Sequence, residues 1–177
     1  MWLYPPAKIG YFLGFLVFSY FCLVIIIDFE HKLILHVISL AGIFIGIIVG
    51  TIRLNLPTSL VGGLAGFLVM ISFYGFGILF ARYRAKKGFS DGEEALGFGD
   101  VTISTVLGFM LGWPFILYGL MIGILTGGII SLFLLIYLVW IKKYEPMTIF
   151  TAYGPYLVFG AAILIFFPNF LTIMSGR

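Results

Sequence analysis

The chain has 177 residues, of which 62% are hydrophobic and 10% are charged, and its formal net charge is +3. A soluble domain is about 45–50% apolar and about 25% charged, so this composition excludes an ordinary soluble protein and predicts an integral membrane protein. The basic residues lie in short segments between apolar runs, which is typical of loops that flank membrane helices, and we expect no nucleic-acid partner.

Six apolar runs follow one another along the chain. They are continuous and do not alternate between apolar and polar residues, which favours helices over membrane-spanning strands. At about 20 residues per span, the sequence predicts an all-α bundle of six transmembrane helices that forms a single membrane domain over residues 1–177. The expected spans cover about residues 10–27, 37–52, 59–81, 100–112, 115–141 and 152–171.

The second apolar run carries glycines at a spacing of four residues. Gly42, Gly46 and Gly50 lie on one face of a helix with that spacing. Small residues in this pattern let two helix backbones approach closely. We therefore expect this face to pack tightly against another helix of the bundle.

The cysteine and histidine content argues against a metal site. The single cysteine, Cys22, lies inside the first apolar run and is expected to be a small buried side chain. His31 and His36 are five residues apart, which places them poorly on one helix face. We expect no metal and no cofactor.

The lysines and arginines divide unequally between the two sides of the predicted bundle. Seven lie on one side and three on the other, and the side with more positive charge is expected to be cytoplasmic. The first set is Lys32, Arg82, Arg84, Lys86, Lys87, Lys142 and Lys143, and the second is Lys8, Arg53 and Arg177. This predicts a multi-pass protein of the cytoplasmic (inner) membrane, in contact with the lipid bilayer.

Two aspartates stand at the ends of apolar runs on the side expected to be cytoplasmic. Asp28 closes the first run, and Asp100 stands at the start of the fourth. An ionisable group at such a depth is costly, so it marks function and needs a partner. Two carboxyl groups a few ångström apart share one proton, which is the arrangement that acid–base hydrolysis of a peptide bond requires. The pair therefore suggests an aspartyl protease that faces the cytoplasm.

Each of these acids also has a purely structural interpretation. Asp100 suits the N-cap of a helix, because aspartate favours that position. Asp28 is also explained as an interfacial acid whose charge Lys32 balances. Glu93 and Glu94 are typical of a solvated loop.

Four segments in order resemble the type IV prepilin peptidases. Gly97-Phe98-Gly99-Asp100, preceded by Glu94-Ala95-Leu96, is similar to the GxGD segment of that family, and Ile27 to Lys32 is similar to its first aspartate motif. Residues 59–67 are similar to its third span, and Tyr153-Gly154-Pro155 resembles the segment that opens its last core helix. The resemblance covers nearly the whole chain.

The resemblance implies an aspartyl endopeptidase with Asp28 and Asp100 as the catalytic residues. Its partners would be prepilin or pseudopilin precursors, from which it removes a short basic leader. Gly97 and Gly99 would let a substrate strand run beside Asp100, and Glu94 would attract the basic leader.

The chain departs from the family pattern in three places. Leu35 and His36 stand where the family usually has a proline and then Asp or Asn, and Thr102 stands where a lysine is common. Large bacterial members also carry an N-terminal segment with a cysteine-bound zinc region linked to N-methylation. The sequence contains no such segment, so we expect peptidase activity without methyltransferase activity.

Two other functions are compatible with a pair of membrane acids. A small transporter or assembly scaffold would use Asp28 and Asp100 to bind protons or cations. A presenilin-like GxGD protease would cut inside transmembrane helices, but the last span has no Pro-Ala-Leu sequence. Neither alternative requires a basic leader in its substrate.

Overall fold

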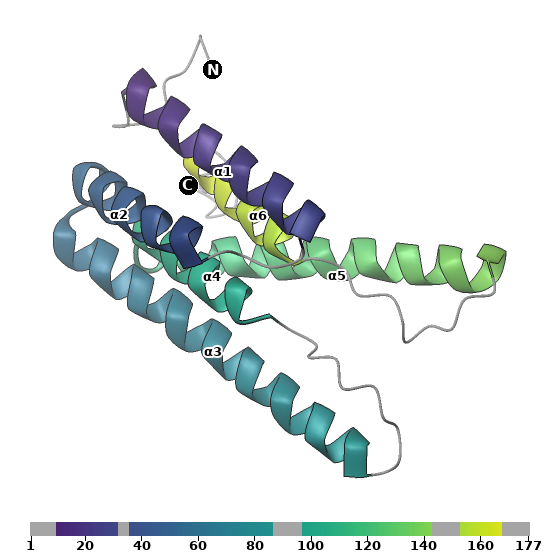
Figure 1. Ribbon diagram of the computed structural model, residues 1–177. Helices are drawn as coiled ribbons and strands as arrows, with labels where there is room; N and C mark the ends of the chain where they lie inside the picture. Colours follow the sequence, from purple (N-terminus) through teal and green to yellow (C-terminus); the bar gives the residue numbers. More distant parts are fainter. Residues whose placement is uncertain (1–9, 32–35, 87–96, 143–152, 168–177) are drawn as a thin grey trace, which may run out of the picture.

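A computed structural model of the chain describes residues 10–31, 36–86, 97–142 and 153–167. Within these ranges all regular structure is helical, as the sequence predicted (Figure 1). The helices are α1 (Tyr11–His31), α2 (His36–Arg53), α3 (Leu56–Lys86), α4 (Phe98–Leu111), α5 (Phe115–Lys142) and α6 (Gly154–Phe166).

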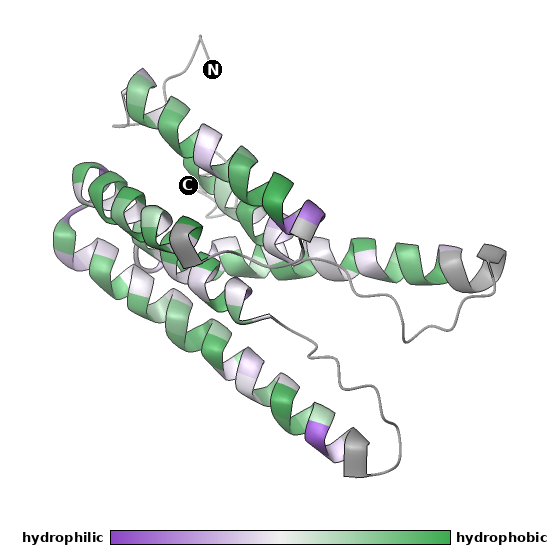
Figure 2. Ribbon diagram, in the orientation of Figure 1, coloured by the Kyte–Doolittle hydropathy of each residue, from purple (hydrophilic) through white to green (hydrophobic). Residues whose placement is uncertain are grey.

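Three of the described helices are long and apolar enough to cross a membrane. These candidate spans are Tyr11–Asp28 in α1, Leu56–Tyr83 in α3 and Phe115–Tyr137 in α5. The others are apolar but shorter: the 14 residues of α4 rise about 21 Å, against a hydrocarbon core of about 30 Å. Within the described residues the all-helical prediction is confirmed, and three of the six expected spans are long and apolar enough to cross a membrane. That the three shorter apolar helices also cross it stays a prediction. Apolar residues cover most of the outer faces of the bundle (Figure 2).

The last helix is shorter than predicted. The sequence predicts a span to about residue 171, but α6 ends at Phe166. Pro168 follows two residues later, and proline disfavours the helical conformation in the residue before it. Residues 168–171 lie outside the described part of the chain.

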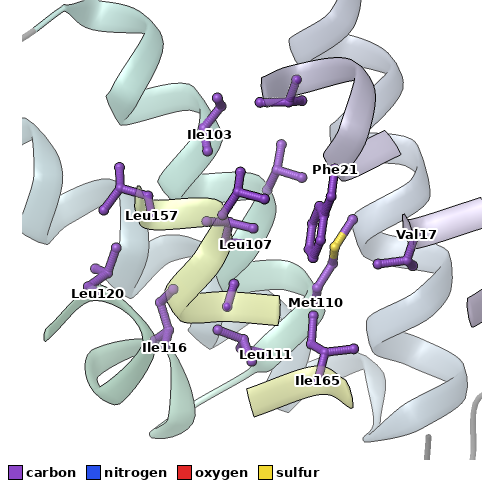
Figure 3. Packing of buried hydrophobic residues seen from close by; sticks show 14 of the residues in the cluster. Val17, Phe21, Ile103, Leu107, Met110, Leu111, Ile116, Leu120, Leu157 and Ile165 are labelled. Atoms are coloured by element: carbon purple, nitrogen blue, oxygen red, sulfur yellow. The ribbon is translucent and has the colours of Figure 1, made fainter. Parts of the chain in front are cut away.

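Helix α4 is the centre of the bundle. It packs against α2, α3, α5 and α6, whereas α1 packs on α6 and α2. Nine of its 14 residues are buried. Figure 3 shows Leu107 and Met110 of α4 between side chains from α1 and α6, such as Phe21 and Leu157, all of them buried.

Glycines bring α3 and α4 into direct backbone contact. A Cβ atom added to Gly62 would lie 2.5 Å from Cα of Gly112, and one added to Gly66 would collide with the carbonyl oxygen of Ser104. The hydroxyl of Ser59 donates a hydrogen bond to the carbonyl oxygen of Phe109 at 2.8 Å. These contacts leave no room for a side chain at Gly62 or Gly66.

The glycine face predicted on α2 also packs against α4. A Cβ atom on Gly46 would lie 3.0 Å from the carbonyl oxygen of Val106, and one on Gly50 would meet the carbonyl oxygen of Phe109. Gly42 lies against Val106 and the hydroxyl of Tyr20. The prediction of close packing on this face is confirmed, and α4 is held between glycine faces of α2 and α3.

Substitution of Gly108 tests this packing. A Cβ atom there would lie 2.8 Å from the carbonyl carbon of Gly62 and 2.9 Å from Cα of Gly63, and backbone cannot move aside as a side chain does. We expect Gly108→Ala to lower the free energy of unfolding by about 1–3 kcal/mol, measured as thermal unfolding in detergent. Gly75→Ala is the control, because nothing lies within 4 Å of a Cβ atom there. Equal stability of Gly108→Ala and the wild type would contradict this packing.

Candidate active site

Asp28 lies three residues before the end of α1 and is 5% exposed. Asp28 lies against Gly154, the first residue of α6. A Cβ atom added to Gly154 would lie 2.5 Å from Oδ2 of Asp28 and 3.1 Å from its Cγ. The backbone N–H of Gly154 interacts with this carboxylate, but Oδ2 itself is buried without a hydrogen-bond partner. Asp28 is therefore enclosed by protein and is not an exposed interfacial acid.

Asp100 lies in the first turn of α4 and is 8% exposed. The N-cap of α4 is Gly97, and no side chain caps this helix end. The backbone N–H of Asp100 donates to the carbonyl oxygen of Gly97 at 3.0 Å. The structural alternative, in which Asp100 itself caps the helix, is wrong.

The two acids lie at the same end of the bundle. They are close enough for the charge of Asp28 to act on Asp100. No described Cα atoms of α1 and α4 lie within 8 Å of each other, so the two acids come from helices without close backbone contact. Removing a carboxylate from water is costly unless its environment compensates.

Polar side chains join α2 to the turn that carries Asp100. The hydroxyls of Ser39 and Thr102 lie 3.1 Å apart, and Thr102 donates to the carbonyl oxygen of Gly99 at 2.8 Å. The hydroxyl of Ser104 donates to the carbonyl oxygen of Asp100 at 2.7 Å. Ser39 is buried, and sequence reasoning did not single it out as part of the site. The available signal was a hydroxyl residue near the start of an otherwise apolar helix.

The backbone at Gly97 is open. Its φ of −80° is one that any residue adopts, so the turn itself does not require glycine. Among the described residues, a Cβ atom there would meet nothing closer than the Gly99 nitrogen at 3.9 Å and Oδ2 of Asp100 at 4.0 Å. Packing within the described part of the chain therefore does not explain the glycine. Gly99 is half-buried, and Glu94 lies outside the described residues.

The two longest helices continue past the acids. Phe98, at the start of α4, packs against Tyr74 of α3 with ring centroids 6.0 Å apart. Gly127 of α5 lies against Tyr153, at the start of α6. The candidate spans end at Tyr83 and Tyr137, nine and ten residues further on, or roughly 15 Å along each helix. The acids are thus set back from the ends of the α3 and α5 spans, which diverge beyond them (Figure 1).

Metal-binding side chains do not gather in the described part of the chain. No group of three or more His, Cys, Asp or Glu residues is found there. The described acids of the site are Asp28 and Asp100, with Glu30 exposed near the end of α1. The chemistry available to these residues is acid–base chemistry at a carboxyl pair.

Comparison with known proteins places the chain in a family. The family model of type IV leader peptidases matches residues 15–132. The chain is 27% identical over 165 residues to a prepilin leader peptidase/N-methyltransferase of Pectobacterium carotovorum subsp. carotovorum, covering 90% of this chain and 52% of the relative. It is 25% identical over 142 residues to a protein of the same name from Pseudomonas putida, covering 79% of this chain and 44% of the relative.

The chain therefore spans about half the length of the curated relatives it matches. No solved structure matches it. The matched range runs from within α1 into α5, and it includes Asp28, Asp100 and the whole of α4. Because that match covers more than half of the sequence, the chain belongs to the type IV leader peptidase family.

Proposed function

We propose that the chain is a membrane aspartyl endopeptidase that removes short basic leaders from type IV prepilin-like precursors. One observation carries this proposal: two buried carboxyl groups, from α1 and α4, lie within electrostatic reach at one end of the bundle. The family and the printed names of the two relatives support the substrate class. The bilayer and the precursor would be the partners, and the chemistry needs no cofactor.

In the proposed reaction, the ionised carboxyl group and the protonated carboxyl group of the pair have different roles. The ionised carboxylate takes a proton from a water molecule, which attacks the carbonyl carbon of the scissile peptide. The protonated carboxyl donates its proton to the carbonyl oxygen. Asp28 and Asp100 are suited to this division because two buried carboxyl groups within electrostatic reach of each other cannot both ionise cheaply. A site enclosed by apolar helices also strengthens electrostatic interactions with the transition state.

The open backbone at Gly97 suits an extended substrate. A peptide running beside Gly97 and Gly99 would present its carbonyl group to the Asp100 carboxylate, which lies 4.0 Å from the Cβ position of Gly97. The acidic side chains of Glu30 and Glu94 would attract a basic leader. Gly97 and Gly99 would then bind the substrate through their backbone, and Glu30 and Glu94 would favour substrates with a basic leader.

The orientation follows from the distribution of positive charge. The end of the bundle that carries Asp28 and Asp100 is also the end at which α3 reaches Lys86 and α5 reaches Lys142. Segments rich in lysine and arginine beside membrane helices stay on the cytoplasmic side. A precursor whose apolar segment lies in the bilayer would hold its basic leader on this side. The extensions of α3 and α5 beyond the acids would flank the scissile bond.

Neutral replacement of either acid tests the catalytic pair. We expect Asp28→Asn and Asp100→Asn each to abolish leader removal, because each variant keeps the shape of the side chain but cannot exchange the proton. Co-expression with a prepilin and separation of precursor from product on a gel measure the processing, and membrane insertion serves as the control. Cleavage that persists in either variant would remove the carboxyl-pair mechanism.

A bulky residue at position 97 tests the path of the substrate. Gly97→Leu should leave thermal unfolding nearly unchanged, because the position is exposed and open. We expect it to reduce cleavage by about 10-fold or more, since misplacement of a substrate by about 1 Å costs up to about 100-fold. Gly75→Leu on α3 is the matched control and should cleave normally. Normal cleavage by Gly97→Leu would show that the substrate passes elsewhere.

A further inference from the structure

The first turn of α6 has a single backbone donor to offer. Pro155 has no N–H, and the N–H groups of Tyr156 and Leu157 donate to the carbonyl oxygen of Tyr153 at 3.1 and 3.2 Å. No side chain caps this helix end. Only the N–H of Gly154 is left, and the positive end of the helix dipole points the same way. The group that lies against it is the carboxylate of Asp28.

The contact at Gly154 is closer than any side chain allows. The Cβ position of Gly154 lies 2.5 Å from Oδ2 of Asp28, a separation that Cβ atoms in proteins essentially never show. Gly154 and Asp28 are both buried, so the carboxylate has no solvent-filled space into which it can retreat. Because Gly154 has no side chain, the carboxylate of Asp28 can lie where a Cβ atom at position 154 would leave it no room.

Backbone contacts with α5 restrict the movement of helix α6. The Cβ position of Gly123 lies 2.9 Å from Cα of Leu157 and 2.9 Å from the carbonyl oxygen of Tyr156. The Cβ position of Gly160 lies 3.2 Å from Cα of Gly123. The start of α6 is therefore fixed between α5 and Asp28, and backbone contacts set its position.

We propose that Gly154 is a positioning residue for Asp28. Its N–H and its missing side chain hold the carboxylate where it acts with Asp100 on the scissile peptide. This inference rests on the proposed function, and it assigns to Gly154 an action through Asp28, without contact with the substrate. A substituted position 154 displaces the carboxylate even though the fold and the substrate path at Gly97 are unchanged.

The kinetic test compares two glycines that lie close together. In the purified full-length chain, we expect Gly154→Ala to lower kcat for leader cleavage by roughly 10- to 100-fold, as expected for a misplaced catalytic group, with KM unchanged. Gly128→Ala on α5 is the control, because nothing lies within 4 Å of its Cβ position, and it should cleave at the wild-type rate. An unchanged kcat in Gly154→Ala would overturn the proposal.

A double-mutant cycle separates positioning from general damage to the helix. Thermal unfolding in detergent is measured for Gly154→Ala in the wild type and in an Asp28→Ala background. Because Asp28→Ala removes the carboxylate that the new methyl group would meet, we expect the loss of stability to shrink or disappear in that background. An equal loss in both backgrounds would show that position 154 acts on something other than Asp28.

The two measurements fail in different ways. If the wild-type chain removes no leader from any prepilin, the proposed function is wrong, while the unfolding cycle still reports on the contact. If the wild type cleaves and the cycle shows no coupling between positions 28 and 154, the positioning role is wrong and the proposed function stands.

Discussion

Backbone contact between α3 and α4 is the constraint on which the site depends. Gly62, Gly66 and Gly108 let the two helices meet without side chains between them, and α2 closes on α4 from another side. Helix α4 has only 14 residues, nine of which are buried. Asp100, in its first turn, is therefore buried together with the rest of the helix. The depth of this acid is a consequence of helix packing.

The second acid reaches the site from a different group of helices. Asp28 belongs to α1, which packs on α6 and α2 and makes no close backbone contact with α4 among the described residues. Helix α6, held by α5 through glycines, supplies the buried amide at Gly154 against which the carboxylate lies. The pair is thus assembled from α4 on one side and from α1 and α6 on the other (Figure 1). The relative position of these helices decides how the carboxyl groups meet.

Much of this arrangement is visible in the sequence. Long apolar runs broken by charges predicted the six helices, and an acid at the end of such a run predicted that Asp28 and Asp100 would lie at one end of the bundle. The glycines of α2 predicted a close helix contact without naming α4 as the partner. The six-span prediction stays a prediction for the three shorter helices, because apolar composition does not reveal whether a helix is surrounded by lipid or by other helices.

The contacts that complete the site could not be predicted from local pattern. Ser39 and Thr102 are 63 residues apart in the chain, and Asp28 and Gly154 are further apart still. No periodicity connects such pairs, because their proximity results from the packing of α2 on α4 and of α1 on α6. The sequence singled out Gly97 as a place beside Asp100 for a substrate strand, and the structure adds that its backbone conformation is one that any residue adopts.

The most direct measurement is the distance between positions 28 and 100 in the membrane. With Cys22 replaced by serine, cysteines at both positions are treated with an oxidant and, separately, with bifunctional thiol reagents of increasing length. The separation of the α1 and α4 backbones predicts little direct disulfide, which requires Cα atoms within about 7 Å, and efficient bridging by a short reagent. Failure of even the longer reagents to join the two positions would contradict the account.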